Sequence, residues 1–294
     1  MPRAASYGSL LDALRGVTWP ARRLARGASA GMHRSRLRGI SPEFTEYRPY
    51  RQGEDPRRID WKLLARTDRA YQRITSDRAT LGTLLLLDAS ASMDYPGGQR
   101  SKWEYACRLA VGLAAVAHAG GDPIGISIAT AAPVRSLEPR TRRGAVGNIA
   151  RLLERVTPGG SEPLGPLLTL ARPEWRVAVI SDFLGDSAAL LRLTRERVLA
   201  GAEIHAMHLV AAEELDPPSA AFMARDPEHP RLERPLVDAT RDEYRETFAR
   251  WRGELAREWL LAGATYAQIA TGEPAEHAVR RLTRPTATVA VGTR

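Results

Sequence analysis

The sequence contains little cysteine, little lysine and no long apolar run, and each shortage excludes a class of protein. One cysteine, Cys107, stands among its 294 residues, which excludes an internal disulfide and a cysteine-based metal site. The longest apolar run, from Leu109 to Ala117, is far shorter than the roughly 20 residues that span a bilayer. The residues after Met1 contain no apolar stretch of the secretory type. We therefore expect a soluble, cytoplasmic protein.

The basic residues are almost all arginines, and they are unevenly distributed. Lys62 and Lys102 are the only lysines among the 43 basic residues. Residues 1–80 contain 17 basic and 8 acidic residues, whereas the rest of the chain contains 26 of each, so the net charge of +9 belongs to the N-terminal part. Arginine makes bidentate contacts with carboxylates and phosphates, which makes this part a candidate for binding an acidic partner.

Residues 1–30 form a basic extension with apolar residues, such as Leu10 and Leu14, at helical spacing. Pro20 predicts a break into two short helices, because proline removes a helical hydrogen bond. Basic amphipathic helices bind anionic membranes, which predicts peripheral membrane contact through residues 6–30 as one function. The alternative that we favour is a helix that docks on its own domain and leaves its arginines in solvent.

Residues 31–80 interleave aromatic, arginine and carboxylate side chains, a mixture that indicates an ordered surface rather than a disordered tail. We expect this segment to pack on the core of the following domain through ion pairs, and a strand starting at Tyr71 to lead toward that core. The alternative is a docking surface for a partner, since tryptophan and arginine are frequent interface anchors. Its candidate residues are Arg57, Arg58, Asp60 and Trp61.

From Gly82 the chain alternates strands with helices, which predicts an α/β fold with a doubly wound, mostly parallel sheet over residues 81–285, followed by a tail, 286–294. The predicted strands are 83–88, 123–130, 175–181, 202–210 and 265–270. The predicted helices are 102–119, 144–156, 187–200, a long helix opened by a capping box at Thr240–Glu243, and 274–282. Residues 211–238 are rich in proline and charge and predict an excursion with a short hairpin around 231–237.

Two predicted strands end in an aspartate, Asp88 and Asp182, and ligands of such sheets collect where strands end. Asp88 is followed by Ser90 and Ser92, and a glycine-hinged loop between the two strands offers the hydroxyl of Ser161. Carboxylate and hydroxyl oxygens are hard ligands that suit Mg²⁺, with Mn²⁺ or Ca²⁺ as alternatives. A helix cap is the alternative reading for Ser92, but it does not account for Ser161 and Asp182.

The pattern Asp88-x-Ser90-x-Ser92, with Ser161 and Asp182, resembles the metal-ion-dependent adhesion site of von Willebrand factor type A domains. The resemblance implies a type A-like domain in which these five residues hold a divalent ion, and the ion accepts an Asp or Glu of a protein client. Ser161 stands where such domains usually carry threonine. It keeps the donor oxygen but lacks the methyl group that restricts the rotamer.

The block from Glu43 to Arg66, with the strands that end at Asp88 and Asp182, is similar to the domain-of-unknown-function 58 family over residues 31–285. Proteins of that family are commonly paired with MoxR-type AAA+ ATPases. The resemblance therefore implies a non-enzymatic adaptor in chaperone-like complex assembly. Many relatives carry transmembrane helices ahead of the block, and this sequence does not.

Two other functions compete with this interpretation. A phosphotransferase would use Asp88 as a nucleophile, but such enzymes carry a second aspartate where this chain has Ser90. A nucleic-acid binder would use the arginine-rich first 40 residues and the pI of about 10.2, although no recognised nucleic-acid motif accompanies them. The six histidines lack zinc-ligand spacing, so we expect them to be core or surface residues. Cys107 lies in an apolar helical stretch, and we expect it to be a small buried hydrophobic residue.

Overall fold

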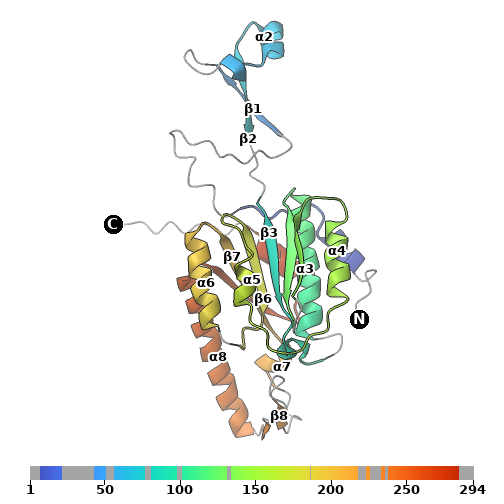
Figure 1. Cartoon of the computed structure of the whole chain (residues 1–294), viewed down its shortest axis with the longest axis vertical. Coiled ribbons are helices and arrows are strands. Elements are labelled where there is room, and N and C mark those ends of the chain that lie inside the picture. The colour runs from blue at the N-terminus through green and yellow to red at the C-terminus, as the bar shows by residue number, and fades with distance from the viewer. Residues whose placement is uncertain are drawn as a thin grey trace, which may run out of the picture. The chain divides into compact units, whose positions relative to one another are not determined.

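The computed structural model describes residues 7–21, 43–50, 56–76, 81–97, 101–130, 134–185, 187–217, 223–225, 233–235 and 238–284. The chain divides into two compact units (Figure 1). The larger unit comprises Met1–Leu24 and Leu81–Arg294, and the smaller unit is Ala25–Thr80. Each unit is described by itself.

The larger unit is built on a six-stranded sheet in the order β10-β7-β6-β3-β4-β5. Its strands are β3 (Thr83–Asp88), β4 (Ile124–Ala129), β5 (Arg135–Arg140), β6 (Arg176–Ser181), β7 (Glu203–Val210) and β10 (Thr265–Ala270). Only the β4–β5 pairing is antiparallel, and the other four pairings are parallel. The predicted α/β class with a mostly parallel sheet is confirmed.

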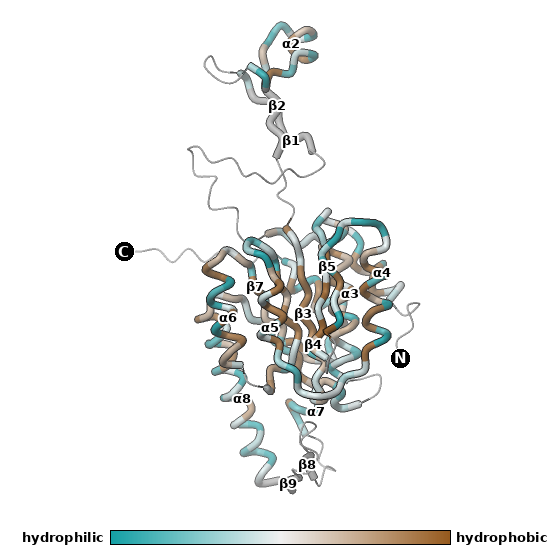
Figure 2. The backbone as a smooth tube through the Cα atoms, viewed as in Figure 1, coloured by the Kyte–Doolittle hydropathy of each residue, from teal (hydrophilic) through white to brown (hydrophobic). Residues whose placement is uncertain are grey.

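Helices cover both faces of this sheet, which is why β3 is a continuous apolar run (Figures 1 and 2). Leu85 and Leu87 face a core formed with α1 (Gly8–Ala13), α3 (Lys102–Ala119), α4 (Ala145–Leu153) and α9 (Ala275–Thr283). Leu84 and Leu86 face a second core formed with α5 (Gly165–Leu168), α6 (Ala188–Leu199) and α8 (Asp238–Leu261). Within the described residues, no helix is both long enough and apolar enough to cross a membrane.

Several predicted boundaries differ from the structure. The edge strand β5 was not predicted, because its alternate residues are solvent-exposed and it contains Pro139, which only an edge strand tolerates. Gly125 on β4 makes room for it: a Cβ there would lie 2.6 Å from the carbonyl oxygen of Leu137. The short helix α5 was also missed. The prediction that α8 starts with a cap at Thr240 is wrong, since the helix already begins at Asp238.

The excursion after β7 contains a hairpin, but its bounds differ from the predicted 231–237: β8 (Met223–Arg225) pairs with β9 (Glu233–Pro235), so only the second strand lies in the predicted range. The hairpin follows the one-turn helix α7 (Ala212–Leu215).

The smaller unit contains an antiparallel pair, β1 (Glu43–Pro49) and β2 (Tyr71–Ser76). The connection between them carries a 3₁₀ turn, η2 (Pro56–Arg58), and helix α2 (Trp61–Thr67). The strand predicted at Tyr71 therefore exists, and its described partner is β1.

The N-terminal segment docks on its own domain, as we favoured for this part of the chain. Tyr7, Leu10, Leu14 and Trp19 are buried in the core that α1 shares with α3 and α9. Leu10 and Leu14 of the first predicted helix are thus covered by protein, and Leu11 and Val17 are partly buried against the same core. The second predicted helix, after Pro20, falls mostly in residues 22–42, outside the described residues.

Gly112 on α3 allows α1 and α9 to approach. A Cβ at this position would lie 2.8 Å from Val279 Cγ2 and 3.1 Å from Leu14 Cδ1. We expect Gly112→Val to lower the free energy of unfolding by about 1–3 kcal/mol through overpacking. Urea denaturation followed by circular dichroism measures this change. Gly147→Val on α4 is the matched control, since nothing lies within 4 Å of its Cβ position. Equal stability of the two variants would contradict the packing argument.

Candidate metal site at the carboxyl edge of the sheet

Asp88 and Asp182 lie at the point where the strand order of the sheet reverses. From β3 the chain proceeds outward through β4 and β5, whereas from the neighbouring β6 it proceeds in the other direction through β7 and β10. The connections that follow the two adjacent strands run in opposite directions at such a switch point, and the crevice outside the carboxyl ends of the strands is where α/β sheets bind ligands. Asp88 ends β3 and Asp182 directly follows β6.

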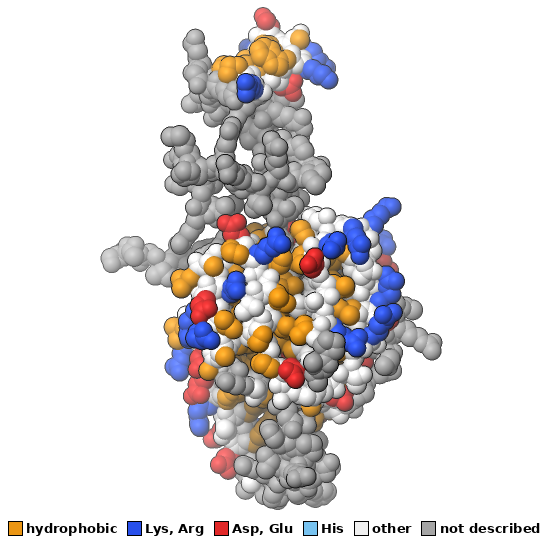
Figure 3. Space-filling view, in the orientation of Figure 1, with side chains coloured by type: hydrophobic (Ala, Val, Ile, Leu, Met, Phe, Trp, Pro, Cys, Tyr) orange, Lys and Arg blue, Asp and Glu red, His pale blue; other side chains and the backbone are white. Residues whose placement is uncertain are grey.

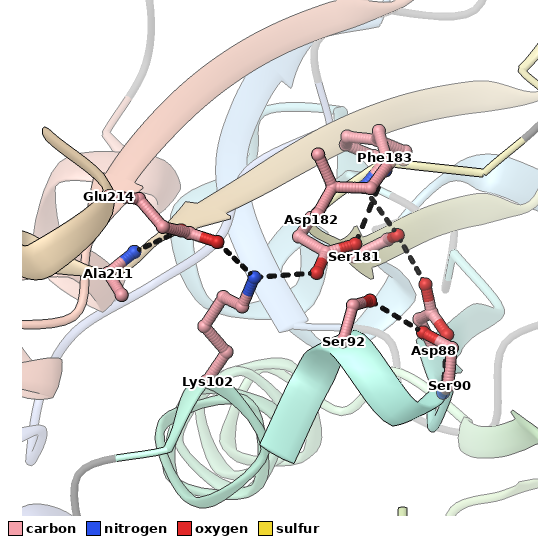
Figure 4. A network of polar contacts seen from close by, with 10 residues as sticks. Asp88, Ser90, Ser92, Lys102, Ser181, Asp182, Phe183, Ala211 and Glu214 are labelled. Atoms are coloured by element: carbon pink, nitrogen blue, oxygen red, sulfur yellow. Dashed lines mark hydrogen bonds and ion pairs between the residues drawn. The ribbon is translucent and has the colours of Figure 1, made fainter. Parts of the chain in front are cut away.

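Asp88, Ser90 and Ser92 form a compact oxygen cluster (Figure 4). Asp88 Oδ1 accepts a hydrogen bond from the Ser90 backbone N–H at 2.8 Å, and Ser90 Oγ lies 3.1 Å from Ser92 Oγ. All three residues are buried. The turn η3 (Ala91–Asp94) that follows β3 positions the two serines, and Ser90, its N-cap residue, makes no side-chain cap bond. The Ser90 hydroxyl is therefore not used as a helix cap, and it lies close enough to the Ser92 hydroxyl for both to bind one ligand.

Ser181 is a member of the cluster that sequence reasoning missed. Its Oγ donates to Asp88 Oδ2 at 2.6 Å and accepts from the Phe183 N–H at 2.8 Å. Phe183 has φ of 53°, a left-handed conformation that is uncommon for a residue with a side chain. Such backbone strain is characteristic of functional sites, where the surroundings enforce it. The only sequence signal was a serine at the end of an apolar strand.

The loop that carries Ser161 is tied to the turn after β3. The Gly159 N–H donates to the carbonyl of Ala89 at 2.7 Å, and the Ala91 N–H donates to the carbonyl of Gly160 at 2.9 Å. Ser161 itself is exposed. These bonds place Ser161 on the rim of an open pocket of about 140 Å³ that Asp88 and Ser90 also line. The apolar part of the pocket wall comes from Pro163, Leu164, Phe183 and Leu190.

Asp182 enters the site already paired with a buried lysine. Lys102 Nζ lies 2.7 Å from Asp182 Oδ2 and 2.6 Å from Glu214 Oε1, and the lysine side chain is 0% exposed. The other oxygen of Asp182 accepts from the Leu184 N–H at 3.3 Å. Glu214 belongs to α7 and also accepts from the Ala211 N–H at 2.7 Å. Neither Lys102 nor Glu214 was predicted to belong to the site.

The electrostatics of the site favour a bound cation. Burial raises the pKa of Asp88, and the nearby charge of Asp182 raises it further, against hydrogen bonds from Ser181 and Ser90 that lower it. Burial alone would lower the pKa of Lys102, but Asp182 and Glu214 outweigh it and the pKa is raised. Lys102 therefore stays charged, whereas among the described residues no basic side chain forms an ion pair with Asp88. A cation beside Asp88 would relieve this repulsion.

The donor set fits a hard divalent ion. Within the described residues, no three His, Cys, Asp or Glu side chains come together as a metal-binding group, so hydroxyls must complete any ligand set. Asp88 and Ser90 supply oxygen donors at one wall of the pocket, and Ser161 supplies a further hydroxyl at its rim. The Ser92 hydroxyl lies behind this wall, 3.1 Å from that of Ser90. Mg²⁺ prefers oxygen ligands and keeps several waters, which an open pocket admits.

The four predicted docking residues lie in the smaller unit. Asp60 Oδ1 accepts from the backbone N–H groups of Lys62 and Leu63, both at 3.1 Å, and so caps the N-terminus of α2. Trp61 is 61% exposed and Arg57 is exposed as well. The side chain of Arg58 lies outside the described residues. Asp60 thus has a structural function that the docking hypothesis did not include.

Cys107 and His208 have the core positions expected for them. Cys107 is buried on α3. His208 packs against the rings of Phe183, Trp251 and Tyr266, and its burial lowers its pKa to about 4. A neutral, ring-packed histidine is typical of a core residue.

Positive charge is also concentrated on one edge of the larger unit, although residues 81–294 carry no net charge. Arg142, Arg143, Arg151 and Arg155 are all exposed on or beside α4. Figure 3 shows basic side chains gathered along this edge. The arginines of the chain are therefore not confined to its N-terminal part.

Comparison with known proteins extends these observations. The chain is 27% identical over 271 residues to an uncharacterized protein of Mycobacterium tuberculosis, covering 89% of this chain and 85% of that one. Among solved structures it is similar to the conserved hypothetical protein BatB of Bacteroides thetaiotaomicron, with 17% identity, a TM-score of 0.46, and 69% and 96% of the two chains covered. It is also similar to the VWA domain of SpRpn10, with 10% identity, a TM-score of 0.40, and 71% and 100% covered.

The family model described as "Protein of unknown function DUF58" matches residues 46–255, more than half of the chain. This match confirms the family resemblance inferred from the block of residues 43–66 and the two strand-end aspartates. The chain therefore belongs to the DUF58 family.

Proposed function

We propose that this protein is a non-enzymatic, metal-dependent protein-binding module. A Mg²⁺ ion would be held by Asp88, Ser90, Ser92, Ser161 and Asp182, with Asp182 acting through water because Lys102 and the Leu184 N–H occupy its two oxygens. The ion would keep an open coordination position, which an aspartate or glutamate of a protein client fills. Binding then needs the metal, the acidic side chain and the pocket together.

The observation that carries this proposal is the convergence of Asp88, Ser90 and Ser161 on one open pocket at the switch point of the sheet. An ion at this position would face solvent on the side of Ser161, which is exposed. The apolar wall beside it, including Leu164 and Leu190, offers contact area to the residues that flank the client's carboxylate. A closed structural site would lack both features.

The residues that follow Asp88 argue for binding rather than for phosphoryl transfer. An aspartate nucleophile works with a second carboxylate as acid and base, and Ser90 occupies that position here. The carboxylate of Asp182 is paired with Lys102. The oxygen cluster is therefore suited to hold an ion and a ligand rather than to transfer a group.

The partner that we propose is a MoxR-type AAA+ ATPase, on the basis of the family resemblance, and the setting is the cytoplasm. The ATPase would use the adaptor to select or hold the acidic client. Arg57 and Trp61 are exposed in the smaller unit and are the candidates for contact with the ATPase.

Affinity capture from the source cells tests the metal-dependent model. We expect wild-type protein to retain a defined set of partners in Mg²⁺ and to release them in chelator, because the client's carboxylate has no ligand position without the ion. Asp88→Ala should retain none of this set in either condition. Asp94→Ala is the matched control, since Asp94 is an exposed carboxylate on the same turn. Recovery of the same partners by Asp88→Ala would rule the model out.

A further inference from the structure

Lys102 is a buried cation at the edge of the candidate metal site, and the proposed function assigns it no part. It stands at the first turn of α3, after the N-cap Ser101, and its side chain extends to Asp182 and Glu214 (Figure 4). Asp182 is 3% exposed and Glu214 is 14% exposed, so water screens neither contact strongly. The ammonium group therefore influences any charge that enters the site.

The choice of lysine here is notable in a chain that otherwise uses arginine. Lys62 is the other lysine, and it is exposed on α2. An ammonium is a compact point charge, whereas a guanidinium is a broad planar fork. The compact group can lie 2.7 Å from one carboxylate and 2.6 Å from another while remaining fully buried. The geometry thus favours a single charge centred between Asp182 and Glu214.

The charge count shows what this cation does to metal binding. With every group counted as ionised, Asp88, Asp182, Glu214 and Lys102 together carry a formal charge of −2, and the three carboxylates without the lysine would carry −3. A bound divalent ion brings the net charge to zero when Lys102 is present and would leave a net charge of −1 without it. The lysine therefore weakens the attraction for the metal, but it also removes the negative charge that would repel an incoming carboxylate.

We propose that Lys102 is a resident counter-cation that lowers the affinity of this site for its metal and keeps the metal-loaded site receptive to an acidic ligand. This inference rests on the proposed metal site. Lys102 is a positioning residue here: its ammonium donates to Asp182 Oδ2 and so occupies an oxygen that would otherwise be free to bind an ion. Glu214 shares the ammonium and so reduces its effect on Asp182.

A purely structural function for Lys102 makes a different prediction. The two ion pairs join the start of α3 to the end of β6 and to α7, and their loss would affect stability. In a folded variant, a purely structural lysine would leave metal affinity unchanged or reduce it by disordering the site. If Lys102 is a counter-cation, Lys102→Met should instead increase the affinity for metal. Metal affinity in the folded variant therefore separates the two interpretations.

The test is isothermal titration of the full chain with Mn²⁺ alone, with folding checked by circular dichroism. We expect Lys102→Met to bind Mn²⁺ about tenfold more tightly than wild type, and Glu214→Gln to bind it several-fold more weakly because Lys102 then acts on Asp182 alone. Lys62→Met and Glu213→Gln are the matched controls and should bind as wild type does. Glu213 is adjacent to Glu214 in α7.

The outcomes separate this inference from the proposed function. If wild type does not bind Mn²⁺, the metal site itself is wrong. If wild type binds and folded Lys102→Met binds equally or more weakly, the counter-cation is overturned while the metal site stands. If Lys102→Met does not fold, the Mn²⁺ affinity of Glu214→Gln tests the inference. Affinity equal to or higher than that of wild type would contradict the proposal that Glu214 reduces the effect of Lys102 on Asp182.

Discussion

Replacing Arg176 with methionine is expected to lower the free energy of unfolding by about 3–5 kcal/mol, the usual loss when one partner of a buried ion pair is removed. Arg176 starts β6 and its side chain is 0% exposed. Its guanidinium lies 3.2 Å from Asp122 and 3.7 Å from Glu203, both largely buried. Methionine has a similar length but no charge, so both carboxylates would lose their cation.

The same guanidinium holds the N-terminal segment in place. Arg176 Nη2 donates to the carbonyl oxygen of Trp19 at 2.9 Å, and the guanidinium carbon lies 4.3 Å from the centroid of the Trp19 ring. The substitution should therefore also expose Trp19, which is 6% exposed in the wild-type protein. A red shift in tryptophan fluorescence below the unfolding transition, absent when Trp19 is also replaced by phenylalanine, would report this release, because the chain contains six tryptophans.

Urea denaturation of Arg176→Met measures the loss of stability. Arg192→Met is the matched control, because Arg192 forms an ion pair with Glu196 at 3.1 Å but its side chain is 65% exposed. Exposed pairs of this kind are worth about 0.5 kcal/mol or less. A loss below about 1 kcal/mol for Arg176→Met would show that the buried network contributes little to folding.

In the described part of the larger unit, the charge networks of Arg176 and Lys102 lie at opposite ends of β6. The network of Arg176 begins at the amino end of β6 and continues from Glu203 to His205, whose Nε2 lies 2.8 Å from Glu203 Oε1. Trp19 covers it. The network of Lys102 lies at the carboxyl end of β6, beside an open pocket. We infer that the network of Arg176 serves stability and that the network of Lys102, which is also buried but lies beside the pocket, serves binding.

The sequence predicted those parts of the site that depend on local pattern. Asp88, Ser90 and Ser92 follow one apolar strand within five positions, and Asp182 follows another. Because both strands are parallel and central, their carboxyl ends meet at one edge whatever the loops do. Ser161 was predicted from the glycine-hinged loop, and its place depends on two backbone bonds that no sequence pattern reveals.

The residues that sequence reasoning missed depend on pairing between distant segments. Lys102 and Glu214 are 112 positions apart, and they meet because β6 and β7 pair in parallel with Ser181 opposite His208. That register carries the start of α7 next to Asp182. The sequence signal was a lysine at the start of an apolar helix in an arginine-rich chain. This signal indicates that the ammonium group of Lys102 has a position that arginine would not fit, but it identifies neither Asp182 nor Glu214 as its partner.

Asp88→Asn is expected to remove metal binding and, in the absence of metal, to stabilise the fold by about 0.5–2 kcal/mol, as changes that relieve functional strain often do. The asparagine side chain has nearly the same shape as aspartate, and its amide oxygen can still accept from the Ser90 N–H. Its amide nitrogen can donate to Ser181 Oγ in place of the present hydrogen bond. Burial and the charge of Asp182 disfavour the ionised form of Asp88 and so raise its pKa. The substitution removes this unfavourable charge.

The sign of the pH dependence follows from that raised pKa. An ionised carboxylate with a raised pKa costs stability at neutral pH, and the cost disappears as falling pH protonates it in the folded protein. The stability advantage of Asp88→Asn in metal-free buffer should therefore shrink from neutral toward acidic pH. Chemical denaturation at several pH values measures this difference.

Adding metal should make wild type more stable than Asp88→Asn, the reverse of the order expected without metal. An ion present at 100 times its Kd stabilises the form that binds it by about 2.7 kcal/mol, so Mg²⁺ should raise the stability of wild type above that of Asp88→Asn. The variant, with affinity lowered about 100-fold or more, should gain almost nothing. Asp94→Asn, on the same turn but exposed, should follow wild type throughout. If Asp88→Asn is instead less stable than wild type in the absence of metal, the Asp88 carboxylate stabilises the fold as a structural cap. Its burial would then give no support to a metal site.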